Sequence, residues 1–552
     1  MTDLPETQYA IQLVGPDELV LNRSKEVFRP GACQILCRVE AVGLCFSDLK
    51  LLKQFSAHGR KSEIVSGIAQ DVLSQIPSYV PGQAPTVPGH EAIVTIEATG
   101  KGVEKFSRGQ RYLVQTDYRW LKTATSNAAL GYNFEGALQQ YVLMDERVIT
   151  SPQGQSMLIP VSDKLSASAA ALVEPWACVE DAYASEERTC IKKGGRMLIA
   201  ADKEIAGDAF DKLFAEYGRP GEITWLSKYA QPDMPVKKAD TLAALDDNCY
   251  DDIVYFGSNA DIVEGLFAKA AAHGLVNIVL CGGRLGREVE TMIGRVHYGG
   301  IRIVGTPGLH AGESMRHIPQ TGEIRKGDTI NVVGAAGPMG TMHVIRNLCL
   351  GVEGVSVFAG DVDDNRLNAL SRIAAPLANQ RGLKYKAYNA GKEQINEQFD
   401  YIVLMAPVPA LVAASVQQAA EGGIVNIFAG IPASVTGKID LDKYIEKRLY
   451  FIGTSGSVLE DMHRVLARVE SGTLDTDVSV AAVCGIEGAA AGMRAVERRE
   501  VAGKIVVYPH CKGLELTLLE DMNEKMPAVA ELLENGLWTK QAERKLLEMY
   551  QN

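Results

Sequence analysis

Apolar runs alternate with longer amphipathic stretches through the second half of this chain. The run Ile330–Val333 is an apolar, β-type segment that ends in a glycine-rich turn and passes at once into a helical pattern from Pro338. The next strand candidate, Gly354–Gly360, ends at Asp361. Apolar strands that alternate with helical stretches are typical of parallel α/β units.

The glycine-rich turn predicts a dinucleotide-binding site, and we expect the coenzyme NAD there. Backbone N–H groups at a helix N-terminus can hold a pyrophosphate. An acid at the end of the next strand, here Asp361, can hydrogen-bond the adenosine ribose. The first glycine of the usual G-x-G-x-x-G pattern falls on Ala335, with Gly334 one place early, which is a departure from that pattern. The expected coenzyme contacts are Gly334, Ala335, Gly337, Pro338, Met339, Gly340 and Asp361.

An acidic cluster after the second strand bears on the choice of coenzyme. Asp361 is followed closely by Asp363 and Asp364, and these carboxylates would repel the 2′-phosphate of NADP(H). The sequence therefore favours NAD(H). The alternative is that the cluster is a solvated loop.

The chain contains an internal repeat, because the same apolar pattern returns about 150 residues later. We interpret it as two tandem doubly wound domains. In the first copy the strand Arg196–Ala200 runs into Asp202 and Glu204 instead of close-spaced glycines, so a pyrophosphate would meet like charge. A structural role is expected for this copy, with a modified ligand site as the alternative. The matched segments are 251–254 with 400–403, 274–278 with 423–427, and 303–306 with 451–454.

Before both repeats, the N-terminal part reads as short strands and turns and carries residues with metal-ligand chemistry. Cys45, His90, Glu91 and Glu174 provide thiolate, imidazole and carboxylate groups, which are the ligands of catalytic zinc. Taken singly, Cys45 could be a buried thiol and His90 a turn residue. Their occurrence together with a dinucleotide-binding pattern predicts a Zn²⁺ site.

The motifs around these residues resemble the zinc-dependent medium-chain dehydrogenase family, most closely its sorbitol, sugar-phosphate and threonine dehydrogenase branch. The resemblance covers residues 25–180 and 320–508. A tail segment, 532–538, weakly resembles sorbose-phosphate reductases. The motifs that carry the family resemblance are Gly43–Asp48, Gly89–Glu91, Glu174–Pro175, Gly337–Gly340, Gly492–Glu497 and Ala502–Val507.

The resemblance implies a role for each site residue. Cys45 and His90 would be zinc ligands, and Glu91 or Glu174 would complete the shell. Ser47 would relay the substrate proton, and Asp48 would orient the His90 ring, unless it is a solvated turn acid. Zinc would polarise the substrate oxygen and favour hydride transfer to the nicotinamide. The implied catalytic residues are Ser47, Asp48 and Glu174.

The chain also departs from the family. Phe46 stands where glycine or arginine is common, and the cysteines of a structural zinc lobe are missing. An additional stretch at 56–85, with helical character at Glu63–Ile76, either faces the substrate or is surface decoration.

The predicted fold is α/β: a discontinuous, β-rich GroES-like catalytic domain with two tandem Rossmann-like domains inserted, the first of them degenerate. The predicted ranges are 1–185 for the first part of the catalytic domain, 190–312 for the degenerate copy, 320–455 for the NAD-binding copy, and 456–552 for the return to the catalytic domain with a helical tail.

Composition narrows the function classes. A net charge of −12 without a basic stripe argues against nucleic-acid partners, and the chain lacks an apolar run of about 18 residues, which argues against a membrane partner. The N-terminus lacks a secretion signal and the cysteines are scattered, so we expect a cytoplasmic protein with reduced thiols.

Two functional interpretations remain open. The first is a zinc-dependent oxidoreductase acting on the secondary alcohol or ketone of a polyol, sugar or sugar phosphate. The second is a catalytically degenerate nucleotide-binding or regulatory protein. The assembly is expected to be a homodimer, or a monomer with an internal pseudo-dimer in which the final strands, Ile301–Gly305 and Leu449–Gly453, bring the two copies together. The alternative is contact through helices or loops.

Overall fold

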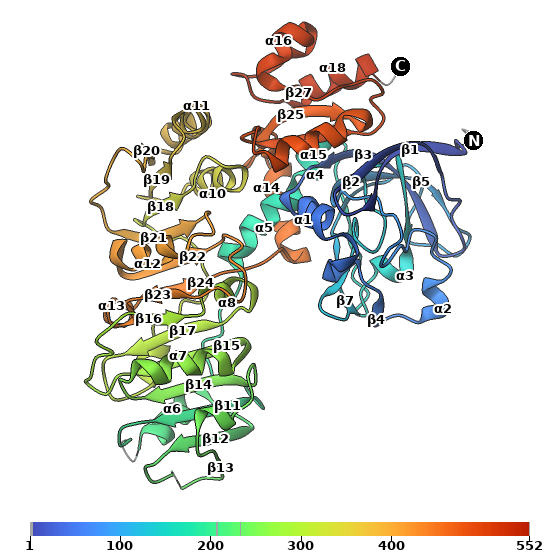
Figure 1. Cartoon of the computed structure of the whole chain (residues 1–552). Helices are drawn as coiled ribbons and strands as arrows, with labels where there is room; N and C mark the ends of the chain where they lie inside the picture. The colour runs from blue at the N-terminus through green and yellow to red at the C-terminus, as the bar shows by residue number, and fades with distance from the viewer. Residues whose placement is uncertain (1–3, 206–207, 232, 551–552) are drawn as a thin grey trace. The chain divides into compact units, whose positions relative to one another are not determined.

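The computed structural model describes residues 4–205, 208–231 and 233–550, and it forms two compact units (Figure 1). Unit 1 contains Met1–Cys178 and Ser457–Asn552, and unit 2 contains Val179–Gly456. One unit is therefore built from both ends of the chain and the other is inserted within it. Among the described helices, none is long and apolar enough to cross a membrane.

The main sheet of unit 1 is completed by the returning C-terminal segment. Its strand order is β10-β6-β5-β3-β26-β25-β27, with β9 also paired to β3. In the central pair, Val506 lies opposite Gly43 and Val507 opposite Val42. The prediction of a discontinuous β-rich domain is confirmed. The strands are β3 (Gln34–Gly43), β5 (Glu91–Thr99), β6 (Arg111–Val114), β9 (Tyr141–Asp145), β10 (Leu158–Pro160), β25 (Val480–Gly485), β26 (Lys504–Tyr508) and β27 (Thr517–Leu518).

Smaller sheets and short helices surround this sheet. The small sheets contain β1 (Thr7–Gly15) with β2 (Glu18–Glu26), and β4 (Ile64–Ser66) with β7 (Asp117–Thr123) and β8 (Asn127–Ala129). The α-helices are α1 (Phe46–Gln54), α2 (Gln70–Leu73), α3 (Glu146–Ile149), α4 (Ala167–Ala171), α14 (Leu459–Glu470), α15 (Ala489–Glu497), α16 (Met522–Lys525), α17 (Pro527–Ala530) and α18 (Lys540–Tyr550). The 3₁₀ turns are η1 (Phe55–Ala57), η2 (Gly59–Lys61), η4 (Thr476–Ser479), η5 (Ile486–Gly488) and η6 (Leu519–Asp521). Helix α5 (Val173–Ala184) begins in unit 1 and ends in unit 2.

The C-terminal tail is tied into unit 1 by a buried carboxylate. Glu543 of α18 accepts hydrogen bonds from the backbone N–H groups of Ala167 (2.6 Å) and Ser168 (2.8 Å), at the N-terminus of α4. These are donors that a helix cannot satisfy by itself. Burial and the neighbouring Glu543 carboxylate raise the pKa of Asp477 well above its ordinary value. The tail is thus part of the packing of this unit.

The additional stretch is less helical than its sequence suggests. The helix predicted at Glu63–Ile76 is reduced to α2, and β4 replaces its first turn. Gly67 separates the two elements with a φ of 98°, a left-handed conformation that ends the strand and cannot continue into a helix. The prediction of a helix over this range was therefore wrong.

Unit 2 contains two parallel sheets with the same topology, which confirms the predicted pair of Rossmann-like folds. The orders are β13-β12-β11-β14-β15-β17 and β20-β19-β18-β21-β22-β24. The first copy contains β11 (Arg196–Ala201), α6 (Ala209–Tyr217), β12 (Glu222–Ser227), β13 (Lys237–Lys238), η3 (Leu242–Ala244), β14 (Tyr250–Phe256), α7 (Ala260–Lys269), β15 (Ala270–Val279), β16 (Val289–Thr291), α8 (Ile293–Tyr298), β17 (Arg302–Thr306) and α9 (Gly312–Met315). The second contains β18 (Thr329–Val333), α10 (Pro338–Cys349), β19 (Ser356–Asp361), α11 (Asp364–Arg381), β20 (Lys384–Asn389), β21 (Phe399–Leu404), α12 (Pro409–Gln418), β22 (Ala419–Ile427), β23 (Gly437–Ile439), α13 (Leu441–Glu446) and β24 (Tyr450–Ile452).

The two copies meet at a seam formed by their final strands, β17 and β24. These strands are in contact but belong to separate hydrogen-bonded sheets. The Tyr444 hydroxyl connects them, because it donates to the carbonyl of Ile303 (2.8 Å) and accepts from the N–H of Phe451 (3.1 Å). A second link is the antiparallel pair of β16 and β23. One apolar core runs through both copies.

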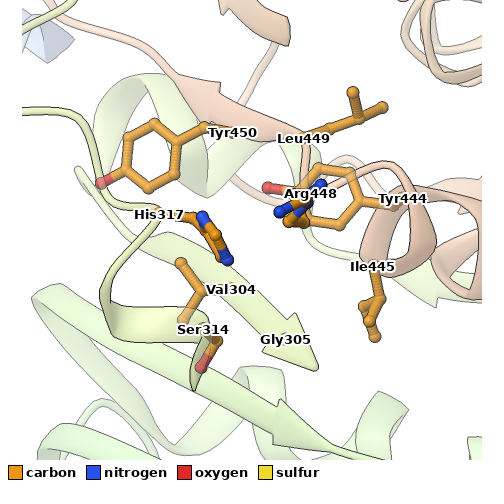
Figure 2. A pocket seen from close by; sticks show the side chains of 9 residues that line it. All are labelled: Val304, Gly305, Ser314, His317, Tyr444, Ile445, Arg448, Leu449 and Tyr450. Carbon is orange, nitrogen blue, oxygen red and sulfur yellow. The ribbon is translucent and has the colours of Figure 1, made fainter. Parts of the chain in front are cut away.

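A small hollow remains in this seam, and Figure 2 shows the side chains that line it. Its volume is about 10 Å³. That is room for about one water molecule, so a substrate does not fit there. The seam is therefore a packed interface.

Replacing Tyr444 by phenylalanine should weaken the seam. The substitution keeps the ring but leaves a buried carbonyl and a buried N–H without their shared partner, which should lower the free energy of unfolding by about 1–3 kcal/mol. Denaturant unfolding measures this change. The control is Tyr229→Phe, which alters a half-buried tyrosine that follows β12 and should change stability by less than about 0.5 kcal/mol. Equal stability of Tyr444→Phe and the wild type would contradict the bridging role.

Candidate functional site

The first half of the candidate metal site is the turn from β3 into α1. Cys45 is the residue before the helix and has extended backbone angles (φ −122°, ψ 150°). Asp48, in the first helical turn, accepts a hydrogen bond from the Cys45 N–H at 3.1 Å. An acid three residues after the capping position is a favoured way to satisfy a free donor there. The sequence thus fixes the position of the Cys45 thiol locally.

The second half is the turn Gly89–Glu91, which leads into β5. The Oδ1 atom of Asp48 accepts from the Gly89 N–H (3.3 Å) and lies 3.0 Å from Nδ1 of His90. Asp48 is 1% exposed and His90 6%. A single buried carboxylate therefore holds both turns and fixes the orientation of the imidazole, which leaves Nε2 of His90 available to a ligand.

Cys45, His90 and Glu91 come together as a group that could hold a metal ion. One ligand atom from each lies within 4.8 Å of the others. Oε1 of Glu91 is 2.6 Å from Nζ of Lys504, while Oε2 is buried and has no hydrogen-bond partner among the described residues. A thiol, an imidazole and a carboxylate with an unsatisfied oxygen fit the donor set that zinc prefers.

Lys504 is a site residue that sequence reasoning missed. It begins β26 and its side chain is 5% exposed. Burial opposes its charge, but the charges of Glu91 and Cys45 keep the pKa of Lys504 above its ordinary value. The sequence did contain a signal for this residue, because Lys504 directly precedes the apolar run Ile505–Val507. A lysine that is buried with such a run needs a buried partner of opposite charge.

Glu174, the alternative acidic ligand, is buried in the first turn of α5 outside that group of three. The Cys178 thiol donates to its Oε1 at 3.8 Å. Burial raises the pKa of Glu174 to about 7; His90 acts against this rise and the Glu91 carboxylate adds to it. Glu174 thus lies within electrostatic reach of the group, and Glu91 is the acid within it.

The remaining residues of the first turn differ in exposure. Ser47 is half-buried in the first turn of α1, and Phe46 beside it is 54% exposed. Two further residues were not predicted from sequence: the Tyr132 ring centre lies 6.0 Å from that of His90, and the Arg60 guanidinium lies 5.5 Å from the Tyr132 ring centre.

In unit 2, the glycine turn after β18 is shifted by one residue from the usual pattern. Gly334 has a φ of 84°, so the chain makes its left-handed turn one position early and Ala335 is fully buried. A Cβ at Gly340 would overlap the Gly334 carbonyl, whereas one at Gly337 would meet only that oxygen at 3.9 Å. Gly340 therefore allows close packing of helix and turn, and Gly337 leaves the backbone open where a pyrophosphate would approach.

Among Asp361, Asp363 and Asp364, Asp361 is the acid that hydrogen-bonds to the glycine turn within the described structure. Its Oδ2 accepts from the Ala336 N–H at 3.0 Å, and its Oδ1 accepts from the Val362 N–H at 2.7 Å. Asp363 caps α11, and Asp364 pairs with Lys392. The turn contains the other expected coenzyme contacts, with Pro338 and Met339 as the first residues of α10.

The corresponding turn in the first copy carries an acid in place of the glycines. Asp202, directly after β11, accepts a hydrogen bond from the Tyr255 hydroxyl at 2.7 Å. A Cβ at Gly257 would overlap this carboxylate. Glu204 is exposed nearby in sequence, and residues 206–207 lie outside the described structure.

Comparison with known proteins agrees with these folds. Residues 31–153 match the family model of the alcohol dehydrogenase GroES-like domain. The solved structure of 2R,3R-butanediol dehydrogenase from Bacillus subtilis is similar, with a TM-score of 0.53, 14% identity, and coverage of 91% of this chain and 100% of that one. A putative zinc-binding dehydrogenase from Sinorhizobium meliloti bound to NADP has a TM-score of 0.50, 13% identity, and coverage of 92% and 100%.

Two curated relatives match part of the chain. One is the mannitol-1-phosphate 5-dehydrogenase of Aliivibrio fischeri, 27% identical over 251 residues, and the other is the uncharacterized protein YggP of Escherichia coli, 27% identical over 249 residues. Each match covers 41% of this chain and 58% of the relative. The chain therefore spans somewhat more than half the length of these relatives.

Proposed function

We propose that this chain is a zinc-dependent medium-chain dehydrogenase that transfers hydride between NAD(H) and a secondary alcohol or ketone. The observation that carries the proposal is the group of Cys45, His90 and Glu91, whose ligand atoms lie within 4.8 Å of one another. The unsatisfied Oε2 of Glu91 and the contact between Nδ1 of His90 and Asp48 support a metal at this place.

In this proposal the metal is held by Cys45, His90 and Glu91. Bound zinc would act as a Lewis acid on the oxygen of the substrate. Asp48 would accept a hydrogen bond from Nδ1 of His90 and orient the ring, so that Nε2 would be the nitrogen that binds the metal. Lys504 holds Oε1 of Glu91, which would leave Oε2 to bind the metal. Ser47, on the same turn as Cys45, would exchange the substrate proton.

The coenzyme is assigned to the second copy. NAD supplies the hydride chemistry, and the chain supplies a binding surface for it. The helix N-terminus at Gly337 offers backbone N–H groups for the pyrophosphate. Asp361 would accept hydrogen bonds from the ribose hydroxyls. The first copy, with Asp202 in the corresponding place, would bind no dinucleotide.

We assign the substrate to the polyol, sugar and sugar-phosphate class. The partial similarity to a mannitol-1-phosphate 5-dehydrogenase supports this class. A reducing compartment such as the cytoplasm suits the protein, because its ten cysteines are scattered and form no close-spaced framework.

Replacing Cys45 by alanine should abolish metal binding and turnover. Wild-type protein should contain about one zinc per chain, and the variant should lose most of it together with more than about 1,000-fold in kcat/KM, because Lewis-acid stabilisation supplies several kcal/mol. Elemental analysis and steady-state assays with polyols, sugar phosphates and NAD measure both effects. Cys190→Ala, at an exposed thiol, is the control. Full zinc content and activity in Cys45→Ala would contradict the site, and wild-type protein without zinc or turnover would favour the nucleotide-binding alternative.

The coenzyme preference should depend on Asp361. Wild-type protein should bind NAD(H) more tightly than NADP(H), at one dinucleotide per chain, and Asp361→Ala should reduce that preference by about tenfold or more because a like-charge repulsion is removed. Titration of tryptophan or coenzyme fluorescence measures both affinities. Asp364→Ala, which changes an exposed acid paired with Lys392, should leave the ratio unchanged. Tighter binding of NADP(H) by the wild type, or two dinucleotides per chain, would contradict this assignment.

A further inference from the structure

The additional stretch between α1 and β5 places an arginine against Tyr132, whose ring lies next to that of His90 in the candidate metal group. Arg60 lies in η2 and forms a two-pronged ion pair with Asp117 of β7, with N–O distances of 2.6 Å and 3.2 Å. The Arg60 side chain is 28% exposed and that of Asp117 is 9% exposed. The pair is therefore fixed in position and still reachable from solvent.

Tyr132 connects this pair to the metal group. The Arg60 guanidinium lies 5.5 Å from the centre of the Tyr132 ring, and the His90 ring lies 6.0 Å from the same centre. The charge of Glu174 also acts on Arg60, and despite burial the pKa of Arg60 is raised, chiefly by Asp117. Arg60 and Asp117 thus lie within the same region of unit 1 as His90.

The stretch itself is anchored by other contacts. The Gly59 carbonyl accepts from the Thr123 hydroxyl at 2.9 Å, and the amide of Asn133 donates to the Ser62 carbonyl at 3.1 Å. Lys61, fully buried, donates to the Ala84 carbonyl at 2.9 Å, and β4 pairs with β7. These contacts fasten the stretch on both sides of Arg60, independently of its half-buried guanidinium.

The chemistry of the pair selects a kind of ligand group. A guanidinium offers only donors and a carboxylate only acceptors, so together they match hydroxyl groups, which donate and accept at once. Asp117 already neutralises most of the Arg60 charge, which makes the pair a weaker match for a phosphate dianion than an unpaired arginine.

We propose that Arg60 and Asp117 bind hydroxyl groups of a polyhydroxylated substrate on carbons other than the reacting one. The proposal rests on the proposed dehydrogenase function and narrows its substrate class to polyols and sugars. In this proposal the additional stretch, residues 56–85, takes part in substrate recognition through Arg60, which lies outside the metal group.

Paired substrates test this proposal. The assay compares the zinc-loaded wild type with three zinc-loaded variants, Arg60→Met, Arg60→Lys and Asp117→Asn, in the presence of NAD. One substrate is 2-butanol, which has a single hydroxyl. The other is sorbitol, mannitol or xylitol, whichever the wild type uses best. KM for the polyol should rise about 10- to 100-fold in the variants, since a lost hydrogen bond to a charged group has that magnitude. The kinetics on 2-butanol should stay within about twofold of wild type. Arg23→Met, at a 62% exposed side chain, is the control.

Several outcomes would overturn the proposal. Unchanged polyol KM in Arg60→Met, or equal loss on both substrates at full zinc content, would show that the pair makes no contact or only supports the fold. If Arg60→Met does not fold, Arg60→Lys, which keeps a charge for Asp117, must show the polyol-selective rise. Mannitol 1-phosphate is assayed as a third substrate, and a defect confined to it would assign the pair to phosphate instead. Wild-type protein inactive on every alcohol would instead reject the proposed function.

Discussion

The site in unit 1 depends on the buried carboxylate of Asp48. It accepts from the backbone of Cys45 and of Gly89, and it bonds Nδ1 of His90. The Cys45 turn and the His90 turn lie far apart in sequence, so neither could fix the other through local geometry. Burying a carboxylate costs free energy unless each of its oxygens has hydrogen-bond partners. Here those partners belong to the Cys45 turn and the His90 turn. Asp48 thus fixes the turns that carry Cys45 and His90 relative to each other.

A second buried charge completes the arrangement. Lys504 arrives on β26, from the segment that returns to unit 1 after the inserted domains, and it pairs with Glu91. The discontinuous fold therefore contributes to the site as well as to the sheet. The N-terminal and C-terminal segments must come together before the Glu91 carboxylate has its buried charge partner.

The fold was predictable from the sequence where a hydrophobic pattern extends over a whole strand or helix. The parallel strands and their repeat follow from apolar runs, and Cys45, His90 and Glu91 follow from residue types within short motifs. Contacts made at long range were not predictable: the Glu91–Lys504 pair, the position of Arg60 and the Tyr444 bridge all depend on tertiary packing. The helix expected at Glu63–Ile76 failed because Gly67 takes a left-handed conformation, and a lone glycine in sequence does not reveal its φ.

The central claim is that Cys45, His90 and Glu91 form a metal site with one thiolate ligand. Replacement of the metal by Co²⁺ tests it directly, because tetrahedral cobalt with a thiolate ligand has strong visible bands and a sulfur-to-metal charge-transfer band in the near ultraviolet. The account predicts both features in the wild type, and loss of the charge-transfer band in Cys45→Ser. A cobalt spectrum typical of six oxygen ligands, or one unchanged in Cys45→Ser, would contradict it.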